Sequence, residues 1–301
     1  MSQARKVYFQ SRGLRCCGLY YQADVVPDDD IRNKHCIVMA HGISGVKEFR
    51  LDAYAEKFSQ AGYNVFVFDY RYFGESEGLP RQLFNIPWQH EDYLAAIEYV
   101  TAAYKIARNK IILWGSSMSG GHVMAVGAKL PELAGVIAQV PHVSGFASVS
   151  LTPFVVALKL SCLAFMDLLG SVLGREPVYV NAAGKPGEVA LMTGPGEEGK
   201  YWKLGPEGFP FDQRIAARAL FSLVRYNPGQ ELKRLKAPAL VQVGLHDITT
   251  PSGAVIKACR RASTVELKTY AVGHFEPYVE PAFSTFISDQ ISFLNRITRS
   301  R

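Results

Sequence analysis

The segment KIILWGSSMSGG, residues 110–121, carries the strongest structural signal in the chain. Its apolar first half has the length of a buried strand, and Gly115, Ser117 and Ser119 then alternate ahead of a stretch with helical character. Small side chains at these positions permit a strained turn and a close approach of helix to strand. The pattern therefore favours a strand, a tight turn and a helix, with the hydroxyl of Ser117 lifted above a sheet.

Short apolar segments alternate with helical stretches on both sides of this turn. HCIVMA (35–40), NVFVFDY (64–70) and GVIAQV (135–140) have the length of strands, and the segments between them are long enough for helices. Strands that are apolar throughout are typical of a parallel sheet covered by helices on both faces. The sequence therefore predicts an α/β fold with a mostly parallel, doubly wound sheet.

The two ends of the chain complete this sheet. RKVYFQS (5–11) and LRCCGLYY (14–21), separated by a turn at Gly13, predict an antiparallel pair at one sheet edge. ALVQVGL (239–245) and VELKTY (265–270) predict two further strands. A last helix is expected near residues 282–296.

Residues 142–236 depart from the alternation, and a connection of that length needs structure of its own. We therefore expect a core made of residues 1–141 and 237–301, with residues 142–236 inserted as a mainly helical cap or lid. The cap would lie at the carboxyl ends of the strands, where open α/β sheets bind their ligands.

Within this cap, the apolar stretch 152–174 predicts one or two helices, which fit an ordinary buried helix and a lid lining a pocket equally well. Lys159 and Asp167 interrupt it, which argues against a membrane span. Gly and Pro signals then predict a hairpin over 178–192 and a helix over 212–226.

Composition limits the classes of function. A chain of 301 residues with 48% hydrophobic and 20% charged residues can bury a large core. The net charge of +6 comes from scattered basic residues, which argues against a nucleic-acid partner. Five cysteines without CxxC spacing fit reduced thiols better than disulfides or zinc. No signal peptide or membrane span is evident, so we expect a cytoplasmic protein without a membrane partner.

The turn at Ser117 resembles the nucleophile elbow of the α/β-hydrolases, Gly-x-Ser-x-Gly, with Ser119 in place of the second glycine. Ser117 is then the nucleophile. Ser116 and Ser119 are weaker candidates because neither has a glycine two residues before it. A plain serine cap at a helix N-terminus is the alternative interpretation of SSMSGG.

Four more motifs strengthen the resemblance, in the family's order along the chain: HGISG (41–45), DYRYFGESEG (69–78), GLHDITTP (244–251) and VGHFEPY (272–278). Together with the elbow they cover both halves of the core. The chain resembles an α/β-hydrolase, and more closely the fungal polyketide transferase and hydrolase group with its dienelactone hydrolase and X-Pro dipeptidyl-peptidase relatives.

A serine nucleophile needs a base, and the base needs a group that fixes its tautomer. His274 follows the last predicted strand, where the family places its catalytic histidine, and Asp247 ends the strand before it. Asp69 also ends a strand, but it precedes the elbow, and the resemblance gives it a loop-organising role. The chain has seven histidines to choose from: His35, His41, His90, His122, His142, His246 and His274.

Acyl transfer also needs donors for the oxyanion that forms in the transition state. His41 and Gly42 directly follow an apolar strand and resemble the family's first oxyanion loop. The resemblance then implies that the backbone N–H groups of Ile43 and Met118 form the oxyanion hole. His41 would shape the loop without exchanging protons.

The predicted function is that of a serine esterase, thioesterase or acyltransferase acting on a hydrophobic, polyketide-like acyl substrate, in secondary metabolism and without metal or organic cofactor. An acyl carrier protein, a polyketide synthase and a second copy of the chain are its candidate protein partners. Two alternatives stay open. One is a non-hydrolytic catalyst of condensation, cyclisation or elimination that uses His274 alone as base; the other is an aminopeptidase-like hydrolase.

Overall fold

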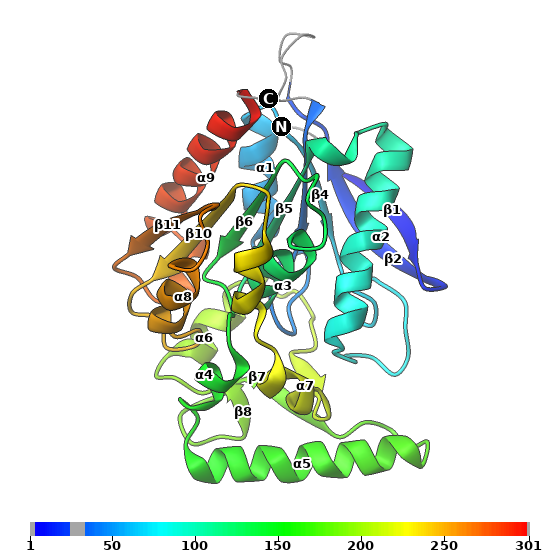
Figure 1. The fold of residues 1–301 in the computed structure, drawn as a ribbon. Helices are drawn as coiled ribbons and strands as arrows, with labels where there is room; N and C mark the ends of the chain where they lie inside the picture. Colours follow the sequence, from blue (N-terminus) through cyan, green and yellow to red (C-terminus); the bar gives the residue numbers. More distant parts are fainter. Residues whose placement is uncertain (1–3, 25–33, 300–301) are drawn as a thin grey trace.

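The computed structural model describes residues 4–24 and 34–299. An eight-stranded sheet lies at its centre, in the order β1-β2-β4-β3-β5-β6-β10-β11 (Figure 1). β2 is antiparallel to both of its neighbours, and all other neighbours are parallel. The expected doubly wound α/β class and the antiparallel edge pair are therefore confirmed. The strands are β1 (Arg5–Ser11), β2 (Leu14–Tyr21), β3 (Cys36–Ala40), β4 (Asn64–Phe68), β5 (Ile111–Ser116), β6 (Gly135–Gln139), β10 (Ala239–Gly244) and β11 (Val265–Tyr270).

Helices cover both faces of this sheet and bury separate apolar clusters. In β3, Val38 packs in the cluster under α2, α3 and α8, whereas Ile37 and Met39 pack in the cluster under α1 and α9. Burial on both faces explains why the central strands are mostly apolar along their whole length. These helices are α1 (Leu51–Gln60), α2 (Ile86–Tyr104), α3 (Met118–Gly127), α8 (Ser252–Cys259) and α9 (Ala282–Arg299).

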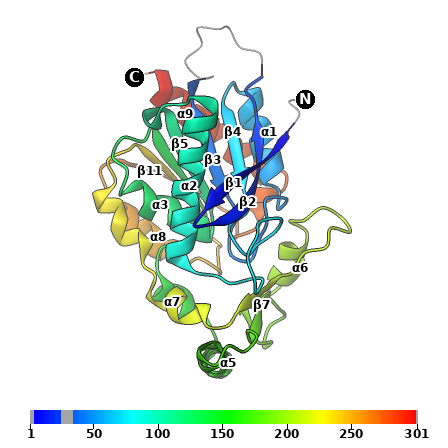
Figure 2. The ribbon, with the colours of Figure 1, turned by 90° about the vertical axis from the view of Figure 1, so that its right-hand side faces the viewer.

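The insertion, residues 142–236, lies below the sheet in Figure 1 and carries a small sheet of its own in the order β8-β7-β9. Helix α5 crosses the far end of the molecule and is seen end-on in Figure 2. The elements are α4 (Gly145–Val149), α5 (Phe154–Val172), β7 (Tyr179–Ala183), β8 (Ala190–Met192), α6 (Glu197–Trp202), β9 (Arg214–Ala216) and α7 (Ala219–Arg225). Short 3-10 helices are η2 (Arg108–Lys110), η3 (Pro228–Arg234) and η4 (Glu276–Tyr278).

Two local predictions for the insertion are wrong. The segment 178–192 is no hairpin, because β7 and β8 run parallel and the antiparallel partner of β7 is β9. Glu188 accepts a hydrogen bond from the backbone of Lys185, which closes a turn in the connection between these two strands. The helix expected over 212–226 begins only at Ala219, since the preceding residues are drawn into β9.

Helix α5 differs from the expectation that its charged residues argue against a membrane span. It is one helix of 19 residues with a mean hydropathy of 1.8 in its most apolar window, so by length and composition it could cross a membrane. Two charged residues in the helix are too few to exclude this. Asp167, however, is buried and accepts hydrogen bonds from the backbone of Val178 and from Arg218. This polar anchor fixes one face of α5 to the rest of the insertion.

Candidate functional site

The turn between β5 and α3 holds Ser117 in a strained conformation, with φ 56° and ψ −119°. Small neighbours are required here: a Cβ on Gly115 would lie 2.2 Å from the carbonyl oxygen of Ser119, and one on Gly121 would lie 2.4 Å from that of His142. The sharp turn predicted from the sequence is therefore present. Its strain is typical of residues held for function.

The other two serines of the turn are engaged elsewhere. Ser119 donates a hydrogen bond to the backbone carbonyl of His41 and also bonds Tyr70. Ser116 accepts a hydrogen bond from the Tyr278 hydroxyl at 2.6 Å. Both hydroxyls thus link the turn to neighbouring loops, whereas Ser117 faces the pocket.

Ser117, His274 and Asp247 lie together in one line of hydrogen bonds. The Oγ of Ser117 is 2.9 Å from Nε2 of His274, and Nδ1 of the same ring is 2.7 Å from Oδ2 of Asp247. All three residues are buried, with exposed fractions of 4–8%. They come from the carboxyl ends of β5, β11 and β10, so residues 157 positions apart in the sequence meet at one edge of the sheet.

The loop after β10 orients the Asp247 carboxylate. Oδ1 accepts the backbone N–H groups of Thr249 at 2.8 Å and Thr250 at 2.7 Å, and Oδ2 accepts the Thr250 hydroxyl at 2.7 Å. Burial raises the pKa of Asp247, but the His274 ring and these hydrogen bonds lower it more, and the pKa lies below its ordinary value. Asp247 is therefore held as a carboxylate.

The contact with Asp247 also shifts the pKa of the His274 ring. Burial lowers the pKa of His274, but the Asp247 carboxylate and its hydrogen bond raise it more, so the pKa lies above its ordinary value of 6.5. The proton on Nδ1 faces the carboxylate, which leaves the lone pair of Nε2 directed at Ser117. This arrangement can remove a proton from the serine.

The loop after β3 lies beside Ser117. A Cβ on Gly42 would stand 3.1 Å from Cβ of Ser117, and Ile43 follows at the pocket wall. Met118 is the first residue of α3, where backbone N–H groups have no carbonyl partner within the helix. His41 is buried, which lowers its pKa to about 4, and its Nδ1 donates to the carbonyl of Gly42 at 2.9 Å. A neutral His41 thus shapes the loop.

Asp69 lies apart from this line of contacts. It accepts hydrogen bonds from the backbone N–H and the ammonium group of Lys47, at 2.7 and 2.8 Å, and from the backbone of Glu75 at 3.1 Å. Gly74 has φ 50°, and a Cβ on it would clash with the Asp69 carboxylate. Asp69 therefore ties two loops together, in agreement with the role that the resemblance implied.

The remaining histidines after the elbow have other surroundings. His122 is fully buried and bonded to Gln89 and the Tyr226 hydroxyl, both at 2.8 Å. His246 is exposed next to Asp247. His142 lies at the pocket wall, and burial lowers its pKa to about 4. Among the described residues, 4–24 and 34–299, no group of His, Cys, Asp and Glu side chains is arranged to hold a metal ion.

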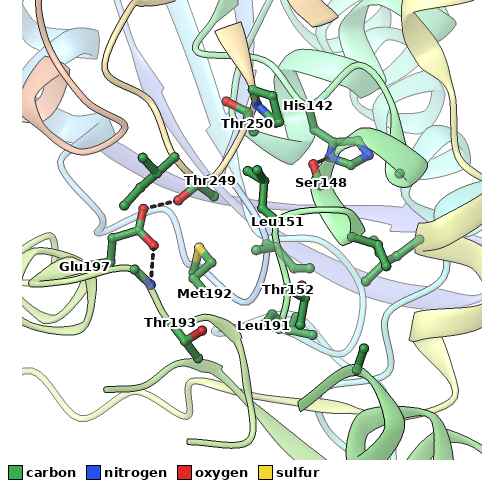
Figure 3. Close-up of a pocket in the computed structure, with 18 of the residues that line it drawn as sticks. His142, Ser148, Leu151, Thr152, Leu191, Met192, Thr193, Glu197, Thr249 and Thr250 are labelled. Atoms are coloured by element: carbon green, nitrogen blue, oxygen red, sulfur yellow. Dashed lines mark hydrogen bonds between the residues drawn. The ribbon is translucent and has the colours of Figure 1, made fainter. Parts of the chain in front are cut away.

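A cavity of about 610 Å³ opens between Ser117 and the insertion. Its walls are largely apolar, and Figure 3 shows Leu151, Leu191 and Met192 around it, with Glu197 and His142 on different sides. Glu197 is buried, accepts a hydrogen bond from the Thr249 hydroxyl, and accepts the backbone N–H of Gly194 at 3.0 Å.

Sequence reasoning missed two parts of this site. Thr250 could have been found, because a hydroxyl three residues after an acidic residue is a common turn contact. Glu197 gave no signal, since it stands in an irregular stretch rich in Gly and Pro.

The strained elbow, the doubly wound parallel sheet and the insertion beside the carboxyl strand ends define the structural class of the α/β-hydrolases. The chain belongs to the α/β-hydrolase family. The sequence model described as serine aminopeptidase, S33, matches residues 31–178. The resemblance indicated by the motifs is thereby confirmed.

Individual relatives agree with this assignment. The chain is 42% identical over 291 residues to the quorum-quenching protein AidA of Acinetobacter baumannii, covering 97% of this chain and 94% of AidA. It is 23% identical over 267 residues to polyketide transferase claH of Penicillium crustosum, covering 83% and 84%. The crystal structure of α/β hydrolase GrgF from Penicillium sp. sh18 has the same fold, with a TM-score of 0.83, 20% identity and 99% of each chain covered. The chain is an enzyme of the hydrolase or acyltransferase type.

Proposed function

We propose that the protein is a serine hydrolase or acyltransferase that cleaves an ester or thioester of a hydrophobic acyl chain through a covalent acyl-enzyme. The observation that carries this proposal is the unbroken line from Ser117 through His274 to Asp247, whose two end residues line the cavity. Nucleophile, base and orienting acid are each within hydrogen-bond distance of the next, as this chemistry requires.

In the proposed first step, Oγ of Ser117 attacks the acyl carbonyl carbon while its proton passes to Nε2 of His274. The carbonyl oxygen becomes an oxyanion, which accepts the backbone N–H groups of Ile43 and Met118. The tetrahedral intermediate collapses, the bond to the leaving alcohol or thiol breaks, and His274 returns its proton to that leaving group. Water or an acceptor alcohol or amine then attacks the acyl-enzyme by the same route in reverse.

The cavity supports a hydrophobic acyl substrate. Its volume lies in the range of small-molecule sites, and its apolar walls come mainly from the insertion, with Leu151, Leu160 and Leu223 among them. Residues 142–236 would thus act as a cap that selects the acyl chain and limits the access of water. The fungal relative claH is named a polyketide transferase, which supports a polyketide-like acyl group. With such a substrate, the proposed role is in secondary metabolism, and a carrier-bound thioester is one proposed form of the substrate.

The experiment that tests this function uses p-nitrophenyl esters of graded chain length together with a fluorophosphonate probe. We expect turnover to rise with chain length to an optimum set by the cavity, and the probe to label the protein at Ser117, identified by peptide mass spectrometry. Labelling at another residue, or turnover that persists in fully labelled protein, would contradict the proposal. Acyl transfer would appear as ester product when an alcohol is added.

The rate should also depend on pH in a definite direction. The base must be neutral to accept a proton, so kcat/KM should fall about tenfold per pH unit below the pKa of His274 in the free enzyme. Because that pKa is raised, we expect the acid midpoint of kcat/KM to lie above 6.5. The pH profile of kcat/KM measures this midpoint, and an unchanged far-UV circular dichroism spectrum over the same range shows that the fold is intact. A midpoint below 6.5 would argue against the contact between His274 and Asp247.

A second candidate for the biological role is inactivation of a signalling molecule that contains an ester bond. The relative AidA, similar over nearly the whole chain, is named a quorum-quenching protein. The same chemistry serves both roles, so the substrate separates them. Loss of signal in a quorum reporter culture after treatment with active enzyme, but not with enzyme inactivated by fluorophosphonate, would favour this role over polyketide metabolism.

A further inference from the structure

Helix α5 has two apolar faces, and only one of them is used within the chain. Val156, Leu160 and Ala164 are buried against the body, and Asp167 anchors the same face. The opposite face is apolar too, although it is exposed to solvent at the far end of the molecule (Figure 1 and Figure 2).

The exposed face carries a regular row of apolar side chains. The row occupies alternating steps of three and four residues, which is the spacing of the contact seam in paired helices. Its five large members have exposed fractions between 50% and 80%, and its sixth member is a cysteine. The row consists of Val155, Leu158, Cys162, Phe165, Leu169 and Val172.

The order of side chains in this row is nearly the same in both directions. Reading inward from the two ends, valine matches valine and leucine matches leucine, and at the centre the small Cys162 matches the large Phe165. Such a row complements an antiparallel copy of itself, as a two-fold symmetric interface requires. A small residue facing a large one also allows close packing at the centre.

The amount of exposed apolar surface is large for a monomer. With Phe154, Met166, Leu168 and Leu173 beside it, the row exposes on the order of 1,000 Å², whereas monomers rarely show apolar patches of more than a few hundred Å². One partner in a stable interface buries about 800 Å². The exposed apolar area on α5 is thus comparable with one side of a stable interface.

We propose that α5 is the dimerisation helix of this protein and packs antiparallel against α5 of a second copy. The two-fold axis would cross the helix pair at the level midway between Leu163 and Ala164. A bilayer surface fits the same face less well, because interfacial helices usually carry several Lys and Arg residues, and α5 has Lys159 alone. A spanning helix would also have to release Asp167 from Arg218.

This dimer would place the partner next to the cavity. Ala157 and Leu160 of the same helix line its wall, so the interface would hold α5 in the position that closes the acyl pocket. The proposal stands independently of the chemistry at Ser117, since it rests only on the outer face of the insertion.

The first test is the mass of the full chain in solution by sedimentation velocity. We expect twice 33.3 kDa for the wild type. The double variant Leu158→Glu/Leu169→Glu should raise the dissociation constant by at least about 100-fold, because it places charges in an apolar interface. The matched control Leu79→Glu changes an exposed leucine that is not part of α5 and should stay dimeric. A monomeric wild type, including one that sediments with anionic phospholipid vesicles, would overturn the proposal, as would a dimer that the double variant leaves intact.

The second test concerns the direction of the two helices. Antiparallel packing brings Cys162 within about 4.5 Å of its copy along the axis, so a short bismaleimide should cross-link wild type but not Cys162→Ser. All five cysteines lie in the described residues, and the other four are buried. In the Cys162→Ser background, Val155→Cys should cross-link only when mixed with Val172→Cys, because two copies of residue 155 would lie about 25 Å apart. Cross-linking of Val155→Cys to itself would overturn the antiparallel arrangement.

Discussion

Replacing Ser117 by alanine should lower kcat/KM for the best p-nitrophenyl ester by about 10⁴-fold or more. The variant lacks the oxygen that would form the acyl bond, and His274 is left with no proton to take. The backbone stays compatible with the turn, because alanine is as small as serine. Residual turnover would come from the oxyanion donors and the pocket acting on water.

The matched control is Ser116→Ala, one residue away in the same turn. Its hydroxyl accepts a hydrogen bond from Tyr278 and does not face the pocket, so the loss should stay within about tenfold. Unchanged ester turnover in Ser117→Ala would remove Ser117 from the mechanism. If ester turnover survived in Ser117→Ala but was lost in His274→Ala, His274 alone would act as base, and no acyl-enzyme would form on Ser117.

The sheet could be predicted from the sequence because burial of a strand requires a local run of apolar residues. β3, β4, β5 and β6 are covered on both faces, so each is buried throughout and mostly apolar, and the segments between them are long enough for helices. The predicted strands lie within two residues of the observed bounds for the same reason. β11 is only partly buried, and VELKTY was predicted as a strand because it continues the alternation of strands and helices.

The short strands of the insertion lack such a run of apolar residues or are too short to show one. β8 and β9 have three residues each and exist because they pair with β7. Which of them is parallel depends on the path of the chain between them, and Gly and Pro indicate only that the chain turns. The apolar character of α5 was evident, but the sequence does not say which of its two faces the chain covers.

The predicted site residues were found through strand ends. Ser117 directly follows β5, and Asp247 and His274 come within four residues of the ends of β10 and β11; parallel strands place their carboxyl ends at one edge. Their mutual distances follow from that topology. Thr250 and Glu197 depend on loop conformation instead, and loops after strand ends have no periodic pattern to reveal which side chains turn inward.

Replacing Asp247 by asparagine should lower kcat/KM by about 10⁴-fold while leaving the fold intact. The backbone N–H groups of Thr249 and Thr250 both point at Oδ1, and only an oxygen can accept them. The amide oxygen of Asp247→Asn is therefore fixed there, and its NH₂ group faces Nδ1 of His274. The ring must then accept at Nδ1 and carry its proton on Nε2, so it has no lone pair for the proton of Ser117.

The measurement compares kcat/KM and the rate of fluorophosphonate labelling in wild type, Asp247→Asn and the control Asp289→Asn. Asp289 accepts hydrogen bonds from Lys268 and Tyr270 outside the pocket, so its variant should label and turn over like wild type. Labelling forms a bond between Oγ of Ser117 and phosphorus and expels fluoride, which leaves without a proton from His274. It therefore reports the nucleophilicity of Ser117 separately from the protonation of a leaving alcohol or thiol, and it should fall together with turnover in Asp247→Asn. If labelling stayed fast while turnover fell, Asp247 would act on a later step, and the tautomer argument would fail.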